Sequence, residues 1–347
     1  MPTIRDVAKL AGVSSMTVSR VVNSSGYASR ETRERVEKAV AELGYVPNSL
    51  ARSLRFKKTK TIALVLTDIT NPYFTTLARA VEDSASENGF SVIFCNTDES
   101  ASEEAEYVNM LLQKQVDGVL LVPARSSAES VLVLQDHQVP VVVLDRRMPG
   151  TEVDVVRGDS ERAAFELIRH LLDLGHTRIA VLTGPAETST AADRVAGYRR
   201  ALAEAGLEPD PRLVIHGQFS EESGYQMAHQ ALGRDPRPTA LFAANNFIAL
   251  GAFRAIRELG LNVPGDVSLV TFDDLPATLM IEPFLTMAAQ PAYEMGLKAI
   301  ELLLARLSGG PADCQEIVLP TELLIRKSSG PARIDDNDPN RDSQSSD

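Results

Sequence analysis

The chain has 347 residues, enough for two or three domains, and its 44% hydrophobic and 24% charged residues are typical of a folded globular protein. No run approaches the ~18–20 apolar residues that span a bilayer, and the first residues form no apolar signal segment. The two cysteines, Cys95 and Cys314, lack CxxC partners, which argues against a disulfide framework or a metal cluster. We therefore expect a cytoplasmic protein that needs no metal and no cofactor.

The net charge of −12 hides two oppositely charged parts of the chain. Residues 1–60 hold 12 Lys and Arg against 5 Asp and Glu, a net charge of +7, whereas the remainder carries −19. A basic end on an acidic body is expected when one end meets nucleic acid phosphates. A basic end that is merely solvated gives the same count, so charge alone does not decide.

Three short helices are predicted within residues 1–47. The first begins in a capping box of Thr3 and Asp6 and stops at Gly12. The other two each begin after a serine, and their predicted N-caps are Ser14 or Ser15, and Ser29. Two short helices joined by a tight turn with glycine indicate a helix-turn-helix.

The second predicted helix would enter the major groove of DNA with its first residues against base edges. Ser15, Met16 and Thr17 occupy these positions, and Arg20 lies one turn later. Arginine suits a bidentate contact to guanine, and methyl groups of Met or Thr suit the thymine methyl. Met16 could instead belong to the core, as we expect of Val18. The residues suited to phosphate contacts are Ser14, Ser19 and Asn23.

This head resembles that of the lactose-repressor (LacI) family. The matching stretches are TIRDVAKLAGVS at 3–14, TVSRVVN at 17–23, LGYVPN at 43–48 and ARSL at 51–54. The resemblance implies a hinge helix in residues 48–59 that forms on operator DNA, with Leu54 as a wedge in the minor groove and Arg52 and Arg55 at phosphates. A plain charged linker is the alternative.

From Thr61 onward, aliphatic runs alternate with helical stretches. The strand-like runs are 62–66, 92–94, 119–122, 141–144, 179–182, 240–243 and 267–270, with two last strands near 316–319 and 322–325. This alternation predicts parallel sheets covered by helices on both faces. Because the pattern restarts after Asp159, we expect an α/β body of two doubly wound lobes behind an all-α head.

The predicted domain limits follow from these patterns. The head takes residues 1–47, the hinge 48–59 and the body 60–328. The first lobe takes about 60–160 and 290–320, and the second about 161–289 and 321–328. Residues 329–347 are nearly devoid of apolar side chains, which predicts disorder. The tail has no leucine heptads, so we expect a homodimer.

Polar and aromatic residues follow the predicted strands at their carboxyl ends, where such sheets bind ligands. Asp, Asn and Arg suit sugar hydroxyls, and aromatic rings suit the C–H faces of a sugar. Each residue alone could be an ordinary loop or cap residue, but together they predict a cleft between the lobes. Asp145 and Asp273 roughly balance Arg146 and Arg194, which disfavours a phosphorylated ligand. The residues expected from these positions are Asn71, Tyr73, Phe74, Asn96, Asp98, Asp145, Arg146, Arg194, Phe219, Asn245 and Asp273.

The body, from about Lys60 to Lys327, resembles the periplasmic sugar-binding-protein fold that LacI regulators carry as a sensor. The motifs are NPYF at 71–74, LDR at 144–146, ADR at 192–194, FD at 272–273 and AQP at 289–291, similar to ribose-binding proteins. In those proteins the matching residues touch the sugar, which adds Gln290 to the site. One departure is Asn245-Asn246, where many relatives have Asn-Asp.

We therefore expect a repressor of sugar-metabolism genes that binds a palindromic operator and responds to a monosaccharide, ribose or similar. GxSxG, Walker A, HExxH and GxGxxG motifs do not occur, so an enzyme is not expected. The alternative is a catabolite-type regulator controlled by a protein partner or a sugar phosphate. That alternative predicts a weak or absent response to free sugars.

Overall fold

The computed structural model describes residues 2–23, 26–46, 59–273, 283–310 and 313–333. The chain divides into two compact units, Met1–Thr59 and Lys60–Asp347, each of which has its own core. In the described residues, no helix is long and apolar enough to cross a membrane.

The described residues of the first unit form three short helices, α1 (Ile4–Ala11), α2 (Ser15–Val22) and α3 (Arg30–Leu43). Their N-caps confirm the sequence prediction, because the side chains of Thr3, Ser14 and Ser29 each accept a hydrogen bond from a backbone N–H of the first turn. Gly12 ends α1 in the left-handed conformation at φ 66°, which glycine adopts without steric cost. The apolar faces of the three helices pack around Val18 and its neighbours.

Across the described residues of the second unit, the strands form two six-stranded sheets, which confirms the predicted α/β class with two doubly wound lobes. The first sheet is wholly parallel, in the order β11-β5-β4-β3-β1-β2. The second has the order β12-β10-β9-β8-β6-β7, and only β12 runs antiparallel to its neighbour. The strands are β1 (Thr61–Leu66), β2 (Ser91–Asn96), β3 (Gly118–Leu121), β4 (Val141–Leu144), β5 (Asp154–Gly158), β6 (Ile179–Thr183), β7 (Val214–His216), β8 (Ala240–Ala243), β9 (Ser268–Phe272), β10 (Thr286–Ala289), β11 (Glu316–Leu319) and β12 (Glu322–Leu324).

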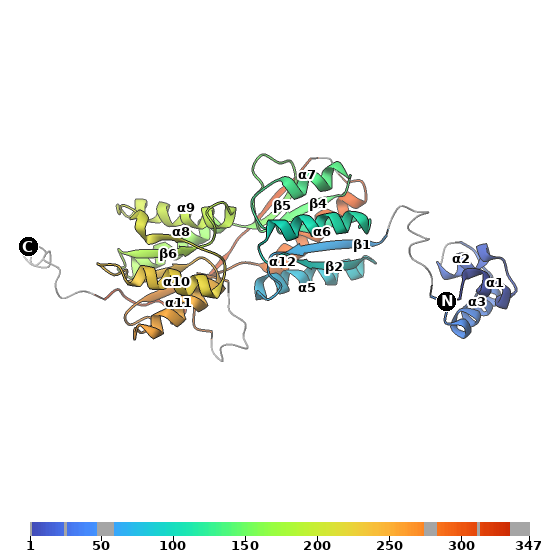
Figure 1. Cartoon of the computed structure of the whole chain (residues 1–347), viewed down its shortest axis with the longest axis horizontal. Helices are drawn as coiled ribbons and strands as arrows, with labels where there is room; N and C mark the ends of the chain where they lie inside the picture. The colour runs from blue at the N-terminus through green and yellow to red at the C-terminus, as the bar shows by residue number, and fades with distance from the viewer. Residues whose placement is uncertain (1, 24–25, 47–58, 274–282, 311–312, 334–347) are drawn as a thin grey trace, which may run out of the picture. The chain divides into compact units, whose positions relative to one another are not determined.

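Helices cover both faces of each sheet (Figure 1). This is the arrangement that continuous aliphatic strands require, because both of their faces must be removed from water. The first sheet packs against α5 (Pro72–Glu87) and α12 (Ala292–Leu307) on one face, and against α6 (Ala101–Gln113) and α7 (Glu129–Asp136) on the other. The second packs against α8 (Ser160–Asp173) and α9 (Ser189–Glu204), and against α10 (Glu221–Leu232) and α11 (Asn246–Glu258). A short 3₁₀ helix, η1 (Pro211–Leu213), precedes β7.

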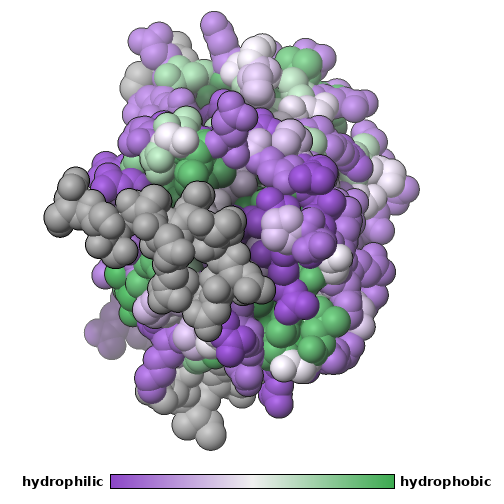
Figure 2. Space-filling view, turned by 90° about the vertical axis from the view of Figure 1, so that its left-hand side faces the viewer, coloured by the Kyte–Doolittle hydropathy of each residue, from purple (hydrophilic) through white to green (hydrophobic). Residues whose placement is uncertain are grey.

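The chain passes between the two lobes three times. It leaves the first lobe after β5, returns between β10 and α12, and crosses again between β11 and β12. β5, β10 and β11 each lead into a crossing at their carboxyl ends. The carboxyl edges of both sheets therefore face a common space between the lobes. The outer face of the second lobe is mostly hydrophilic, with apolar side chains in separate small groups (Figure 2).

Three strands were not predicted from the sequence. β5 contains Asp154 and Arg157, which interrupt its aliphatic pattern, and their side chains pair with Arg306 and Glu316. β7 has only three residues at a sheet edge, and β10 (Thr286–Ala289) is short and begins with threonine. Local patterns as short as these are too weak to distinguish a strand from a loop.

The predicted disorder from residue 329 onward is wrong for Ser329–Arg333. The carbonyl of Gly330 accepts from the Ser268 hydroxyl at 3.2 Å and lies 2.9 Å from Nε2 of the buried His176. The backbone N–H of Ala332 donates to the Leu174 carbonyl at 2.9 Å. These hydrogen bonds hold the segment against the second lobe, although its side chains add little apolar contact.

Gly197 allows α8 and α9 to approach closely. A Cβ atom at this position would lie 2.2 Å from the carbonyl oxygen of Glu161. Any larger residue would therefore push α9 away from α8. This contact bears on the ligand site, because α9 also carries Arg194.

Candidate functional site

The head presents an exposed surface on α2. Met16 is 66% exposed and Arg20 is also exposed, with the Arg20 guanidinium 3.7 Å from the Met16 sulfur. Val18, on the opposite side of the same helix, is fully buried. The prediction that Val18 belongs to the core is therefore confirmed, and Met16 is not part of it.

The other predicted DNA-contacting residues of α2 lie at its two ends. Ser14 caps the helix, and its hydroxyl lies 3.1 Å from the Thr17 N–H and 2.9 Å from the Thr17 hydroxyl. Asn23 follows the helix and donates to the Ser19 carbonyl at 2.8 Å. Ser15 is partly exposed as the first helical residue. Three further predicted residues lie outside the described part of the chain, namely Arg52, Leu54 and Arg55.

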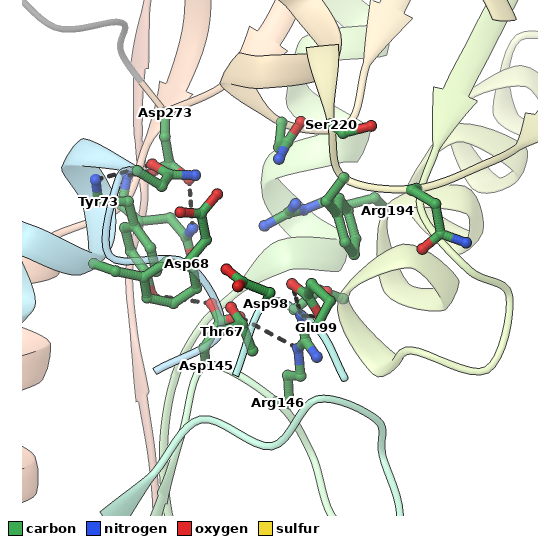
Figure 3. Close-up of a pocket in the computed structure, with 17 residues that line it drawn as sticks. Thr67, Asp68, Tyr73, Asp98, Glu99, Asp145, Arg146, Arg194, Ser220 and Asp273 are labelled. Carbon is green, nitrogen blue, oxygen red and sulfur yellow. Dashed lines mark hydrogen bonds and ion pairs between the residues drawn. The ribbon is translucent and has the colours of Figure 1, made fainter. Parts of the chain in front are cut away.

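A cavity of about 360 Å³ lies between the two lobes of the body (Figure 3). Small-molecule sites in proteins span roughly 300–1,000 Å³, so this cavity suits a small ligand. Side chains from both sheets line it, at the carboxyl ends of the strands. The lining residues are Thr67, Asp68, Asn71, Tyr73, Phe74, Asp98, Glu99, Asp145, Arg146, Thr190, Arg194, Gln218, Phe219, Ser220, Asn245, Asp273 and Gln290.

The first lobe contributes an aromatic and acidic wall. Asn71 caps α5 and accepts a hydrogen bond from the Tyr73 N–H at 3.1 Å, which fixes the aromatic pair of Tyr73 and Phe74 at the start of the helix. The Tyr73 hydroxyl donates to Asp145 Oδ1 at 3.0 Å. Burial and the neighbouring carboxylates of Asp145 and Asp273 raise the pKa of Tyr73 well above 10.0, so this hydroxyl remains a donor.

Arg146 is buried beneath the cavity and is held by protein groups. Its Nη2 donates to both carboxylate oxygens of Glu99, at 2.7 and 2.8 Å, and its Nη1 donates to the carbonyls of Pro123 and Ala124. Only its Nε lacks a partner among the described residues, with Asp145 Oδ2 3.9 Å away. Arg146 therefore lines the cavity, but most of its donors are already used.

The second lobe contributes Arg194, which α9 directs toward the cavity (Figure 3). The side chain is buried, and its guanidinium lies 4.0 Å from the centre of the Phe272 ring and donates to the Ala244 carbonyl. Its Nε has no partner among the described residues. Burial lowers the pKa of Arg194, and the carboxylates of Asp273 and Asp145 partly offset that effect.

Asp273 and Gln290 form a pair at the ends of β9 and β10. Gln290 donates to Asp273 from its side-chain amide at 2.9 Å and from its backbone at 3.3 Å. Burial raises the pKa of Asp273 from 3.8 to about 6, although Arg194 and Gln290 act in the opposite direction. The Gln290 Oε1 is buried without a hydrogen-bond partner in the described structure and lies against Gly158, where a Cβ atom would come within 2.6 Å of it.

The cavity is more acidic than the sequence indicated. The predicted balance of Asp145 and Asp273 against Arg146 and Arg194 is wrong, because Asp68, Asp98 and Glu99 also line the space. Each of these follows a predicted strand, but only the sheet register brings all three to one cavity. The surplus of negative charge strengthens the argument against a phosphorylated ligand.

The structure brings the predicted effector residues together with one exception. Asn96, the last residue of β2, does not line the cavity and instead supports it. It accepts from the Ile69 N–H at 2.6 Å and donates to Asp98 Oδ1 at 2.6 Å. Asp68, which follows the first predicted strand, also lines the cavity. Sequence reasoning did not include several other lining residues, and position beyond a strand end was the available signal for most of them: Thr67, Glu99, Thr190, Gln218 and Ser220.

Direct contacts join the two lobes next to residues that line the cavity. The side-chain amides of Asn71 and Asn246 exchange two hydrogen bonds, at 3.1 and 3.0 Å, in a buried position. Arg147 forms a bidentate ion pair with Asp193, and its backbone N–H donates to the Ser189 hydroxyl at 2.8 Å.

The fold and these two surfaces define a protein with a helix-turn-helix head and a two-lobed body that encloses a ligand-sized cavity. Residues 3–48 match the family model described as "Bacterial regulatory proteins, lacI family", and residues 168–329 match the "Periplasmic binding protein-like domain". The chain belongs to the LacI family and is a DNA-binding transcriptional regulator, not an enzyme.

Relatives and solved structures cover nearly the whole chain. The HTH-type transcriptional regulator DegA of Bacillus subtilis (strain 168) is 40% identical over 95% of this chain and 98% of its own length. The HTH-type transcriptional repressor PurR of Pasteurella multocida (strain Pm70) is 36% identical over 94% and 98%. The lac repressor dimer bound to operator and the anti-inducer ONPF has a TM-score of 0.84 at 32% identity, over 95% of this chain and 99% of that one.

Two further structures contain sugars. The complex of the transcriptional regulator CelR with cellobiose has a TM-score of 0.73 at 34% identity, over 95% of this chain and 100% of that one. A LacI family transcriptional regulator from Enterococcus faecium with bound ribose has a TM-score of 0.70 at 32% identity, over 79% of this chain and 100% of that one.

Proposed function

We propose that this regulator is a repressor of sugar-metabolism genes in the cytoplasm, and that a monosaccharide, ribose or similar, binds in the cavity between its lobes. The observation that carries this proposal is the lining of the cavity. It combines aromatic side chains, carboxylates and buried donors that have no partner among the described residues. Sugar rings need this combination, because they present C–H faces and closely spaced hydroxyls.

The bound sugars of two related structures support the choice of ligand class. One of these structures contains ribose and the other cellobiose. The 360 Å³ cavity is near the lower end of the ~300–1,000 Å³ found for small-molecule sites, which favours a single ring over a longer saccharide. The acidic surplus disfavours sugar phosphates, the ligand of the alternative proposal.

The proposed operator contacts come from α2 and the hinge of a homodimer. Met16 and Arg20 are exposed on one face of α2, where they are free to meet base edges. Two such helices in a dimer would read a palindrome. The hinge at 48–59, with Leu54 in the minor groove, stays a prediction, since of these residues the structure describes only Thr59.

The proposed coupling runs through the contacts between the lobes. A sugar that contacts both walls stabilises the closed arrangement, in which Asn71 meets Asn246 and Arg147 meets Asp193. A change in lobe closure shifts the first lobes of the two protomers relative to each other, and this shift changes the spacing of the heads. A coupling of about 1–3 kcal/mol would change operator affinity about 5–150-fold. We propose release of the operator upon sugar binding.

A thermal-shift screen of the full chain tests the ligand class. The panel contains ribose, other pentoses, hexoses, sugar phosphates and purines. A ligand at 100 times its dissociation constant adds about 2.7 kcal/mol to the free energy of unfolding. A shift with a free monosaccharide supports the proposal, and a shift with phosphates or purines alone contradicts it. No shift with any small molecule would favour control by a protein partner.

Operator binding is tested separately. Leu54→Ala should weaken operator binding and leave the thermal shift with sugar unchanged, because the two units have separate cores. Unchanged operator affinity in this variant would contradict the assigned hinge. Analytical ultracentrifugation of the full chain tests the homodimer.

A further inference from the structure

A buried amide pair joins the two lobes beside the cavity. Asn71 Nδ2 donates to Asn246 Oδ1 at 3.1 Å, and Asn246 Nδ2 donates to Asn71 Oδ1 at 3.0 Å. Both residues are buried, with exposed fractions of 6% and 0%. Asn71 lines the cavity, whereas Asn246 is not among the residues that line it. A residue of the second lobe that does not line the cavity therefore holds a residue of the first lobe that does.

Both side chains also fix the start of a helix. Asn71 Oδ1 accepts from the Tyr73 N–H at 3.1 Å as the N-cap of α5, and Asn246 Oδ1 accepts from the Phe247 N–H at 2.8 Å in the first turn of α11. A carboxamide oxygen has two lone pairs, so each oxygen is saturated by one backbone donor and one side-chain donor. A rotation of either amide would break these hydrogen bonds. The pair therefore ties the aromatic wall at the start of α5 to the second lobe.

The pair requires a carboxamide on both sides. Each Nδ2 faces an oxygen and each Oδ1 faces a nitrogen, so every contact joins a donor to an acceptor. A carboxylate at position 246 would keep the acceptor and lose the donor. An oxygen would then face Asn71 Oδ1 at the place where Asn246 Nδ2 now lies 3.0 Å away. Buried acceptors that face each other without a donor are costly, so this substitution should separate the lobes.

Two ion pairs between the lobes are more exposed to solvent than the amide pair. The side chains of Arg125 and Glu187 form one of them, and these side chains are 48% and 53% exposed. The side chain of Arg147, which pairs with Asp193, is 41% exposed. Exposed ion pairs are screened by salt and contribute little to stability. The loss of the buried amide pair should therefore open the lobes more than the loss of either ion pair.

We propose that Asn246 is a positioning residue for the effector, which acts through Asn71 and does not touch the ligand. This proposal rests on the proposed function, because it concerns the affinity of the monosaccharide in the cavity. A ligand that contacts both lobes binds the closed arrangement, and its apparent affinity falls with the fraction of closed molecules. The amide pair stabilises that arrangement and orients the wall that Tyr73 forms. Because both amides are neutral, this contact should persist at high salt.

Asn246→Asp tests the proposal, because protonation of the introduced carboxyl restores the missing donor. A protonated carboxyl has one O–H donor and an acceptor oxygen, so it can repeat the reciprocal pair with Asn71. Burial favours the neutral form of a carboxyl, which brings this protonation into the range from about pH 8 to about pH 5. Isothermal titration of the full chain with ribose, glucose and galactose measures the dissociation constants of variant and wild type across this range.

At the upper end of this range, Asn246→Asp should bind the monosaccharide roughly tenfold more weakly than wild type. The ratio of the two dissociation constants should fall toward one as the pH decreases. The other ionisable groups near the pair are common to both proteins, so the ratio removes their contribution. On the two helices these groups begin at Arg79 and Arg254, apart from Tyr73. Those that line the cavity are Asp68, Tyr73, Asp98, Glu99, Asp145, Arg146, Arg194 and Asp273.

Two matched variants serve as controls. Asn109→Asp introduces the same carboxyl at an exposed position of α6 and should bind like wild type at every pH. Arg125→Ala removes the exposed ion pair with Glu187 and should change the affinity less than Asn246→Asp does. Thermal unfolding without sugar is measured on the same proteins. The destabilisation of Asn246→Asp relative to wild type should also decrease as the pH falls.

The possible outcomes separate this inference from the proposed function. Equal affinities of Asn246→Asp and wild type at about pH 8 overturn the role of Asn246 and leave the monosaccharide site standing. A weaker affinity whose ratio to wild type ignores pH also overturns it, because the loss then has a cause other than the reciprocal amide pair. If wild type binds none of the sugars, the proposed function fails. The unfolding data then decide on the amide pair, and a destabilisation independent of pH overturns it.

Discussion

The head and the body of this regulator build their recognition surfaces in opposite ways. In the head, exposed side chains such as Met16 and Arg20 come from one helix of eight residues. In the body, the cavity is lined mostly by buried and half-buried side chains from the ends of strands and helices in two lobes. An exposed surface tolerates substitutions without loss of the fold, whereas a buried polar surface requires that every charge and donor keeps a partner. Substitutions should therefore have larger effects in the body than in the head.

Arg194→Ala should have the largest effect. The change removes a buried cationic donor that lines the cavity and should weaken effector binding by roughly 1.5–3 kcal/mol, the contribution of a hydrogen bond from a charged group. Titration calorimetry with the effector found in the screen measures the loss. Arg199→Ala, an exposed arginine on the same helix, is the control and should bind normally. Equal affinities of both variants would contradict the placement of the site.

Arg20→Ala should affect operator recognition alone. Loss of a base contact by an exposed arginine should weaken specific binding by about 1–3 kcal/mol and reduce discrimination at one base pair. Electrophoretic mobility shift with the native operator and single-base variants measures this effect. Effector affinity should stay at the wild-type value. A uniform loss of affinity for all DNA sequences would instead assign Arg20 to a phosphate.

The buried carboxyl of Asp273 should make the stability of the body depend on pH. Its folded-state pKa is about 6, above the ordinary value of 3.8, because of burial. Between these two pH values, Asp273 binds more protons in the folded state than in the unfolded state. The stability that the protonated Asp273 carboxyl contributes is therefore lost as the pH rises through about 6. Relative to wild type, Asp273→Asn should become more stable by roughly 1–2 kcal/mol between pH 5 and pH 7.5.

Thermal unfolding of both proteins across this pH range tests the prediction. The head should not share this dependence, since it contains no histidine and its described acidic residues lie at its surface. A stability difference between wild type and Asp273→Asn that is independent of pH would show that burial does not raise the pKa of this carboxyl.

Ser14→Ala should have the smallest effect. The Ser14 hydroxyl accepts from the Thr17 N–H and caps α2, so its loss should destabilise the head by about 1 kcal/mol. Hydrogen exchange of the α2 amides measures this change. Ser14→Asp retains an acceptor and should restore protection. If Ser14→Ala also weakens operator binding beyond the loss of stability, Ser14 contacts a phosphate as well.

The sequence by itself determined the features that depend only on residues close together in the chain. The helices of the head, their N-caps at Thr3, Ser14 and Ser29, and the alternation of strands and helices all follow from local patterns. The rule that ligands bind beyond the carboxyl ends of strands also located most of the cavity, because it depends on chain order alone. Asn96 shows the limit of this rule, since it has the expected position but supports Asp98 from outside the cavity.

Only the tertiary structure decided which side chains pair across the sheet and between the lobes. Arg146 was expected to face a ligand, but Glu99, 47 residues away in the chain, holds it. The reciprocal pair of Asn71 and Asn246 joins residues separated by 175 positions. Such contacts arise where distant segments meet, and no local spacing encodes them, because electrostatic and hydrogen-bond partners are selected by distance in space.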